Sequence, residues 1–76
     1  MSFQGYLTSI EAKTGKSPDD FRQLAAARGF IDEHGLRQGV KAGAIIAWLK
    51  TDFDLGHGHA MAIFALLKGI KREGDS

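Results

Sequence analysis

Hydrophobic residues recur at the spacing of an α-helix in four stretches of the chain, and no stretch shows the strict alternation of a half-buried strand. We expect the first helix over residues 3–14, between Ser2, which suits an N-cap, and Gly15, which suits a left-handed helix stop. Its inner face is made of residues spaced by three or four positions: Phe3, Tyr6, Leu7 and Ile10.

The second helix has the clearest start signal. Ser17 suits the N-cap and Pro18 the first helical position, and two aspartates then complement the positive end of the helix dipole. Gly29 is expected to end this helix. Residues 32–39 contain two glycines and no clean hydrophobic period, which predicts a solvated loop.

Helical spacing returns over residues 41–53, whose expected inner face includes Ile45, Trp48, Leu49 and Phe53. The two glycines within residues 55–58 then predict a tight break between this helix and the next. The following stretch, His59 to Lys68, is apolar on most sides, which is typical of a central helix. Gly69 is expected to stop this helix, and residues 70–76 are expected to form a frayed polar tail.

These elements predict one all-α domain over residues 1–76, a compact bundle of about four short helices with the C-terminal helix at its centre. The length of 76 residues is enough for a single domain, and the 43% hydrophobic share is too high for a disordered chain. With no cysteine, the chain has neither disulfides nor thiolate metal ligands.

No apolar run approaches the length of a membrane span, and the first residues do not resemble a signal peptide, so we expect a cytoplasmic protein with no membrane partner. The net charge of +1 gives no strong attraction to nucleic acid. A nucleic-acid partner is therefore only weakly supported.

The most unusual stretch is the Gly-His-Gly-His turn, defined as Gly56, His57, Gly58 and His59. The simplest interpretation is a structural turn, because glycine permits close approach of the backbone. The alternative is a ligand site, in which free amides at the start of the next helix bind an anion or the imidazoles bind a metal. Two histidines are too few for a zinc site, and His34 would have to join them, so no metal or other cofactor is predicted.

Two further groups of side chains are candidates for binding. Lys68, Lys71 and Arg72 form a possible basic patch near the C-terminus. Trp48 and Phe53 are expected in the core by their spacing, but a chain this small cannot hide every aromatic, and a partly exposed tryptophan suits an interaction surface.

Known chemical motifs are absent or incomplete. Gly15-Lys16-Ser17 lacks the upstream glycine of a phosphate-binding loop, because position 10 is isoleucine. Residues 41–68 could suggest a helix-turn-helix, but the second helix lacks the polar side chains that read bases. No serine lies in a nucleophile turn, so no catalytic residue is assigned and a non-enzyme is predicted.

Two blocks of sequence resemble one known family. The matching segments are Ser2–Gln4, Tyr6–Leu7, Ile10–Pro18 and Phe21, then Val40–Gly43, Trp48–Lys50 and Leu55–Ala62. Over about residues 2–69, the chain resembles a family of short bacterial proteins known as domain of unknown function 4287. Its members commonly have an acidic residue in place of Ala44 and glycine in place of Asp54. The resemblance implies a small bacterial domain, found alone or fused to others, and implies no activity.

The leading hypothesis is a non-enzymatic helical module that binds a protein, including a second copy of itself as an option. The alternative is binding of an anion, a metal or nucleic acid centred on the Gly-His-Gly-His turn.

Overall fold

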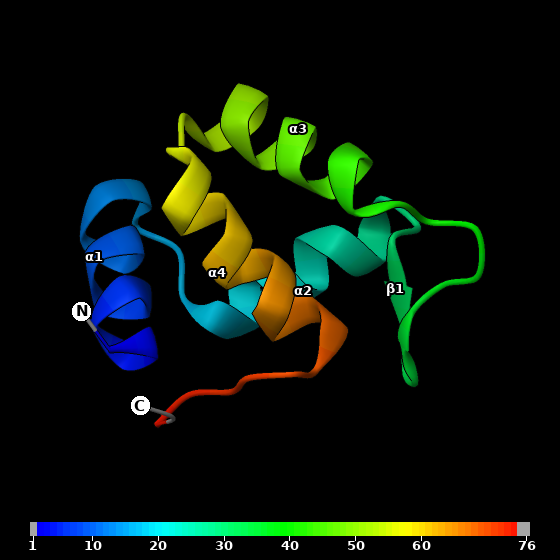
Figure 1. Cartoon of the computed structure of the whole chain (residues 1–76), viewed down its shortest axis with the longest axis horizontal. Helices are drawn as coiled ribbons and strands as arrows, with labels where there is room; N and C mark the ends of the chain where they lie inside the picture. Colours follow the sequence, from blue (N-terminus) through cyan, green and yellow to red (C-terminus); the bar gives the residue numbers. More distant parts are fainter. Residues whose placement is uncertain (1, 75–76) are drawn as a thin grey trace.

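Four α-helices and one short β-hairpin make up the part of the chain that the computed structural model describes, residues 2–74 (Figure 1). In chain order the elements are α1 (Phe3–Thr14), α2 (Pro18–Ala27), β1 (Ile31–Asp32), β2 (Gly35–Leu36), α3 (Ala42–Phe53) and α4 (His57–Lys68). Among these residues, no helix is both long and apolar enough to cross a lipid bilayer.

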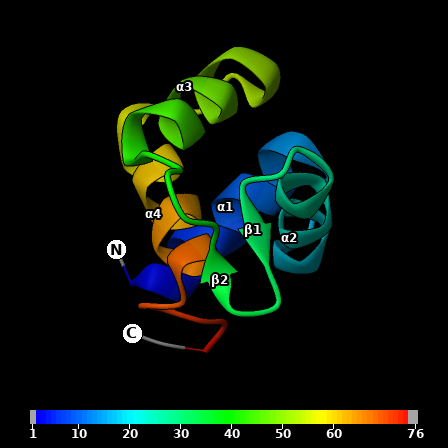
Figure 2. The same ribbon diagram turned by 90° about the vertical axis from the view of Figure 1, so that its right-hand side faces the viewer.

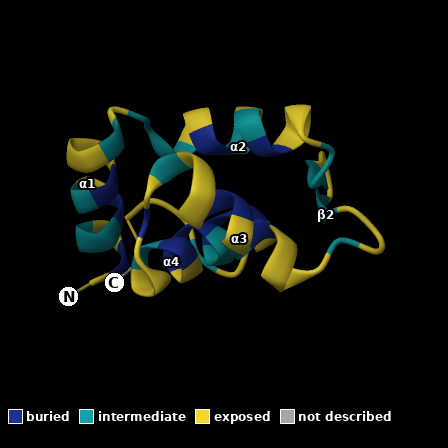
Figure 3. Ribbon diagram, turned by 90° about the horizontal axis from the view of Figure 1, so that it is seen from above, coloured by how far each residue is buried: buried dark blue, intermediate teal, exposed yellow. Residues whose placement is uncertain are grey.

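The C-terminal helix α4 lies at the centre, as its apolar sequence predicts. It contacts α1, α2, α3 and β2, and Figure 1 shows it between α1 and the other helices. Viewed from above in Figure 3, the buried positions of the helices face inward. The buried residues of α4 are Ala60, Ala62, Ile63, Leu66 and Leu67.

The predicted starts of the first two helices are confirmed, together with the interactions that produce them. The Ser2 hydroxyl accepts a hydrogen bond from the Gly5 N–H at 3.1 Å. The Ser17 hydroxyl accepts from the Asp20 N–H, and the Asp20 carboxylate accepts from the Ser17 N–H, which completes a capping box. This backbone bond to the carboxylate is the main reason that the pKa of Asp20 is lowered.

The expectation of a strictly all-α fold is wrong in one place, because the stretch predicted as a loop contains a β-hairpin. Ile31 pairs with Leu36 and Asp32 with Gly35 in antiparallel register. Strands of two residues are too short to show alternation in a sequence. Their turn depends on local chemistry, in which the Asp32 carboxylate accepts the His34 N–H at 2.8 Å. Figure 2 shows the hairpin between α2 and the end of α4.

The predicted break before the last helix is displaced. Helix α4 begins at His57 rather than His59, and the extended residue before it, Gly56, is its N-cap. The sharp reversal occurs instead at Asp54, whose φ of 54° is left-handed. Glycine would adopt this conformation without steric cost, whereas an aspartate adopts it at a cost in free energy.

The segment after α4 folds back against the bundle, whereas its polar sequence predicts a frayed tail. The Ala65 carbonyl accepts the N–H groups of Gly69 and Ile70. Further on, the Gly74 N–H donates to the Gln4 side-chain oxygen at 2.7 Å. A polar segment is fixed here because distant side chains supply its partners. The last residues of the expected tail, 75–76, lie outside the described residues.

Candidate functional site

Two cavities lie against the returning segment, residues 70–74, and one residue of that segment, Lys71, lines both. The first, which we call the α1–α4 groove, has a volume of about 430 Å³. Its lining side chains and glycine come from α1, α4 and the returning segment: Phe3, Tyr6, Gly58, Met61, Ala62, Ala65 and Lys71.

The α1–α4 groove is mainly apolar and partly open to solvent. Met61 is 42% exposed, and Ile70, in the returning segment, is 63% exposed; these are the exposed large hydrophobic residues among residues 2–74. Phe3 and Ala62 are buried, and Tyr6 is half-buried. The groove therefore presents an apolar floor with an accessible methionine, which is the chemistry of a surface that binds apolar side chains.

Small residues on α4 form the bottom of this groove. A Cβ added at Gly58 would lie 3.9 Å from Tyr6 Cε1, which is an ordinary contact distance. Ala62 and Ala65 follow on the same side of the helix. Because glycine and alanine side chains are short, they leave space between α1 and α4 beside Met61, and this space is the groove.

Within the Gly-His-Gly-His turn, Gly58 and His59 lie against Tyr6, whereas Gly56 and His57 are exposed. His59 meets the Tyr6 ring edge-to-face, with 5.7 Å between ring centroids. His57 is exposed at the first position of α4, and the third histidine, His34, lies in the hairpin beside the opposite end of that helix. Within the described part of the chain, no three histidine, aspartate or glutamate side chains gather as metal ligands.

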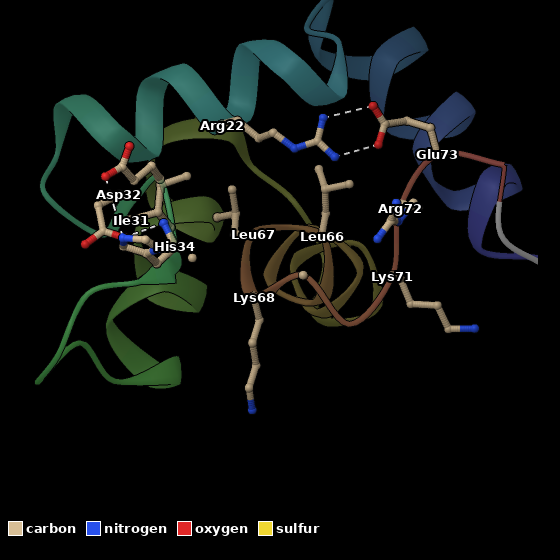
Figure 4. A pocket seen from close by; sticks show the side chains of 13 residues that line it. Arg22, Ile31, Asp32, His34, Leu66, Leu67, Lys68, Lys71, Arg72 and Glu73 are labelled. Carbon is tan, nitrogen blue, oxygen red and sulfur yellow. Dashed lines mark hydrogen bonds and ion pairs between the residues drawn. The ribbon is translucent and has the colours of Figure 1, made fainter.

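The second cavity, which we call the charged cavity, has about 420 Å³ at the C-terminal end of α4. Figure 4 shows Leu66 and Leu67 at its base, the hairpin on one side and the returning segment on the other. It brings together the three residues predicted as a basic patch: Lys68, Lys71 and Arg72. It also contains the carboxylates of Asp32, Glu33 and Glu73, so positive charge does not dominate it.

The strongest ionic contact in the charged cavity is a two-point pair between Arg22 and Glu73. The guanidinium donates to both carboxylate oxygens, at 2.9 and 2.6 Å, and also to Asp19 at 2.7 Å. These bonds raise the pKa of Arg22 and lower the pKa of Glu73 to about 2. The pair ties the returning segment to α2, so its main effect is structural.

Trp48, a candidate for the interaction surface, lies in the core, as its helical spacing predicts. Its side chain is only 6% exposed, and its ring meets Phe30 and Phe53 edge-to-face at 5.3 and 5.4 Å. Phe53 is half-buried and also packs against Phe21. The indole is therefore covered by Phe30, from the connection between α2 and β1, and by Phe53 at the end of α3.

The sequence does not identify Met61 and Tyr6 as groove residues, because Tyr6 fits the inner face of the first helix and Met61 lies in a helix that is apolar on most sides. The sequence feature that could have indicated the groove is the set of small residues around Met61. Gly58, Ala62 and Ala65 are too small to fill the space beside two packed helices.

Residues 2–69 match the profile of a family described as a domain of unknown function (DUF4287). The chain belongs to this family. The match confirms the resemblance seen in the two sequence blocks, and it stops where α4 ends, just before the returning segment. No curated protein matches the chain. No solved structure matches it either.

Proposed function

We propose that this member of the DUF4287 family is a non-enzymatic binding module that recognises another protein through the α1–α4 groove. The observation that carries the proposal is the 42% exposure of Met61 over an apolar hollow of about 430 Å³. Burying such a side chain under a partner gains about 25 cal/mol for each Å² of apolar surface removed from water. Methionine also adapts its shape to different partners.

The non-enzymatic part of the proposal is supported by how the ionisable side chains are used. The Arg22 guanidinium donates to both Glu73 and Asp19, and Asp20 completes a helix cap. The Tyr6 and His59 rings pack together at the edge of the groove. We also retain, as part of this proposal, the cytoplasmic location expected from the sequence.

The alternative, binding of an anion, metal or nucleic acid at the Gly-His-Gly-His turn, has less support. Its two imidazoles do not share a pocket in the described structure, since His57 is exposed and His59 packs on Tyr6. The first turn of α4 has no side-chain cap, but free amides are a general property of helix starts.

The proposal is tested by capture of partners from a lysate of the source organism, with nuclease present and absent. The bait is the wild-type protein, a Met61→Glu variant, or an Ala47→Glu variant as a control. Ala47 is also exposed within a helix, on α3, so both variants add the same charge to a helical surface. Circular dichroism verifies that each variant retains its helices.

We expect at least one protein that is retained by the wild type and the control, survives nuclease, and is lost with Met61→Glu. Equal capture by all three baits would contradict a role for the groove. Material that disappears only with nuclease would favour the nucleic-acid alternative.

A further inference from the structure

We propose that the returning segment, residues 70–74, is a strap that closes one end of the α1–α4 groove, and that breaking its ion pair with α2 opens that end. This control of access rests on the proposed function, because it regulates the same site. The two ends of the segment are bound to the two helices that form the groove.

The segment crosses from α4 to α1 at the edge of the groove. At its start, the carbonyl of the groove residue Ala65 accepts the Ile70 N–H at 3.1 Å. At its end, the Gly74 N–H donates to the side-chain oxygen of Gln4, in the first turn of α1, at 2.7 Å. Lys71, between these two points, lines the groove itself. Figure 1 shows this path from the end of α4 to the start of α1, so the segment bounds the groove there.

A two-point ion pair holds the strap near its end. The Arg22 guanidinium, on α2, donates to both carboxylate oxygens of Glu73 at 2.9 and 2.6 Å. Lys71 and Arg72 also interact within the chain. Because a two-point pair fixes geometry as well as adding energy, the closed position of the strap is well defined.

The strap leaves the bundle without uncovering a buried side chain of its own. None of residues 70–74 is buried, and Ile70 is 63% exposed. The attachment of the strap therefore depends on polar contacts, and both side chains of the Arg22–Glu73 pair are partly open to water. Segments with few buried apolar contacts open at a small fraction of the free energy of global unfolding. We therefore expect the strap to open while the four helices stay folded.

An open strap changes the groove in two ways. Lys71, the one charged side chain among the described lining residues, leaves the groove, and the end of the groove at Ala65 becomes open to solvent. A partner that covers the apolar floor binds this open state better. Its apparent affinity is then reduced by the fraction of molecules in which the strap is closed.

The test measures access to the groove without any partner. The chain has no cysteine, so Ala65→Cys in the full chain places a single thiol in the groove, at a half-buried position beside the strap. Its rate of reaction with the uncharged reagent dithiodipyridine is compared in the wild-type, Glu73→Gln and Asp19→Asn backgrounds. Asp19→Asn is the matched control, because it also removes one carboxylate from Arg22 but lies on α2 rather than on the strap.

We expect the thiol to react about two- to fivefold faster with Glu73→Gln, the range that follows from loss of a partly exposed ion pair. The rate with Asp19→Asn should equal that of the wild type. Added salt should raise the wild-type rate toward that of Glu73→Gln, because it screens the pair. A thiol on α3, introduced by Ala47→Cys at an exposed position, should react equally fast in every background. The exchange rate of the Ile70 amide, measured by NMR without any cysteine, gives an independent comparison.

The outcomes separate the strap from the proposed function. Thiol and amide rates that are equal in the wild type and Glu73→Gln, or that rise as much with Asp19→Asn, overturn the strap and leave the proposed function intact. A faster thiol, together with stronger capture of Met61-dependent proteins by Glu73→Gln, supports both. A faster thiol without any captured protein that depends on Met61 contradicts the proposed function, whereas the opening of the groove stands.

Discussion

The α1–α4 groove and the charged cavity are nearly equal in volume, about 430 and 420 Å³, and Lys71 borders both, yet their chemistry is opposite. In the charged cavity, acidic and basic side chains lie together, and Arg22 and Glu73 bind each other at two points. In the groove, the apolar side chain of Met61 remains 42% exposed to solvent.

Volume alone therefore does not identify a binding site. A ligand entering the charged cavity would have to compete with ion pairs that already exist, and such pairs fasten the returning segment. A partner covering Met61 displaces only water from an apolar surface, which is favourable. The groove is therefore the better candidate, and the charged cavity is better explained as part of the fold.

The largest expected effect contrasts two residues of α4. Leu66 lies at the base of the charged cavity and is only 3% exposed, so Leu66→Ala should destabilise the fold by roughly 2–4 kcal/mol. Met61→Ala should cost less than about 1 kcal/mol because its side chain already contacts water. Urea unfolding followed by circular dichroism measures both. Equal losses would mean that Met61 is a core residue rather than part of an open groove.

The second prediction breaks the ion pair of the charged cavity. Glu73→Gln should lower the unfolding free energy at pH 7 by up to about 1 kcal/mol, because both partners are partly exposed. The folded state lowers the pKa of Glu73 from 4.5 to about 2. Its contribution is therefore complete above pH 4.5 and is lost as the pH falls toward 2.

Unfolding of wild type and Glu73→Gln at several pH values checks this prediction. The difference between the two proteins should disappear near pH 2 and should shrink in high salt. A difference that persists unchanged at pH 2 would show that the carboxylate charge is not its origin.

A third substitution provides a more stable background for groove variants without touching either cavity. Asp54→Gly should stabilise the protein by about 0.5–1 kcal/mol, since glycine adopts the left-handed φ of 54° without strain. The bond from the Lys13 ammonium is retained because it goes to the Asp54 backbone carbonyl, at 2.6 Å. Asp52→Gly, inside α3, is the control and should have the opposite sign. Thermal unfolding checks both, with a higher melting temperature expected for Asp54→Gly and a lower one for Asp52→Gly.

The smallest expected effect concerns the bottom of the groove. Gly58→Ala should change stability by only a few tenths of a kcal/mol, toward greater stability, because the added Cβ lies at ordinary contact distance from Tyr6 and favours the helix. The same methyl group should slightly reduce the room in the groove. A large loss of stability in a thermal melt would restore the interpretation that this glycine is essential for a tight turn.

Local signals predicted much of the fold. The bounds of α1 and the start of α2 were predicted correctly because Ser2, Gly15 and the Ser17–Asp20 box act within a few residues of where they stand. The hairpin was overlooked because its strands have two residues each. The start of α4 was placed too late because glycines usually interrupt helices, whereas here Gly58 lies inside the first turn.

The candidate site was less predictable. The Gly-His-Gly-His turn stood out in the sequence, and the structure places Gly58 and His59 against Tyr6 at the edge of the groove. The exposure of Met61 could not be predicted, because the sequence of α4 is apolar on most sides. Which side remains open depends on where α1 and the returning segment lie.

Local patterns in the sequence are sufficient for the helical segments, the caps of α1, the start of α2 and the central position of α4, because these depend on neighbours a few residues apart and on hydrophobic periodicity. The tertiary structure alone decided that Met61 is exposed and that residues 70–74 return to the bundle. The contacts responsible join residues far apart in the chain, such as Arg22 with Glu73 across 51 positions. No local pattern encodes such contacts, because they exist only after the helices have packed.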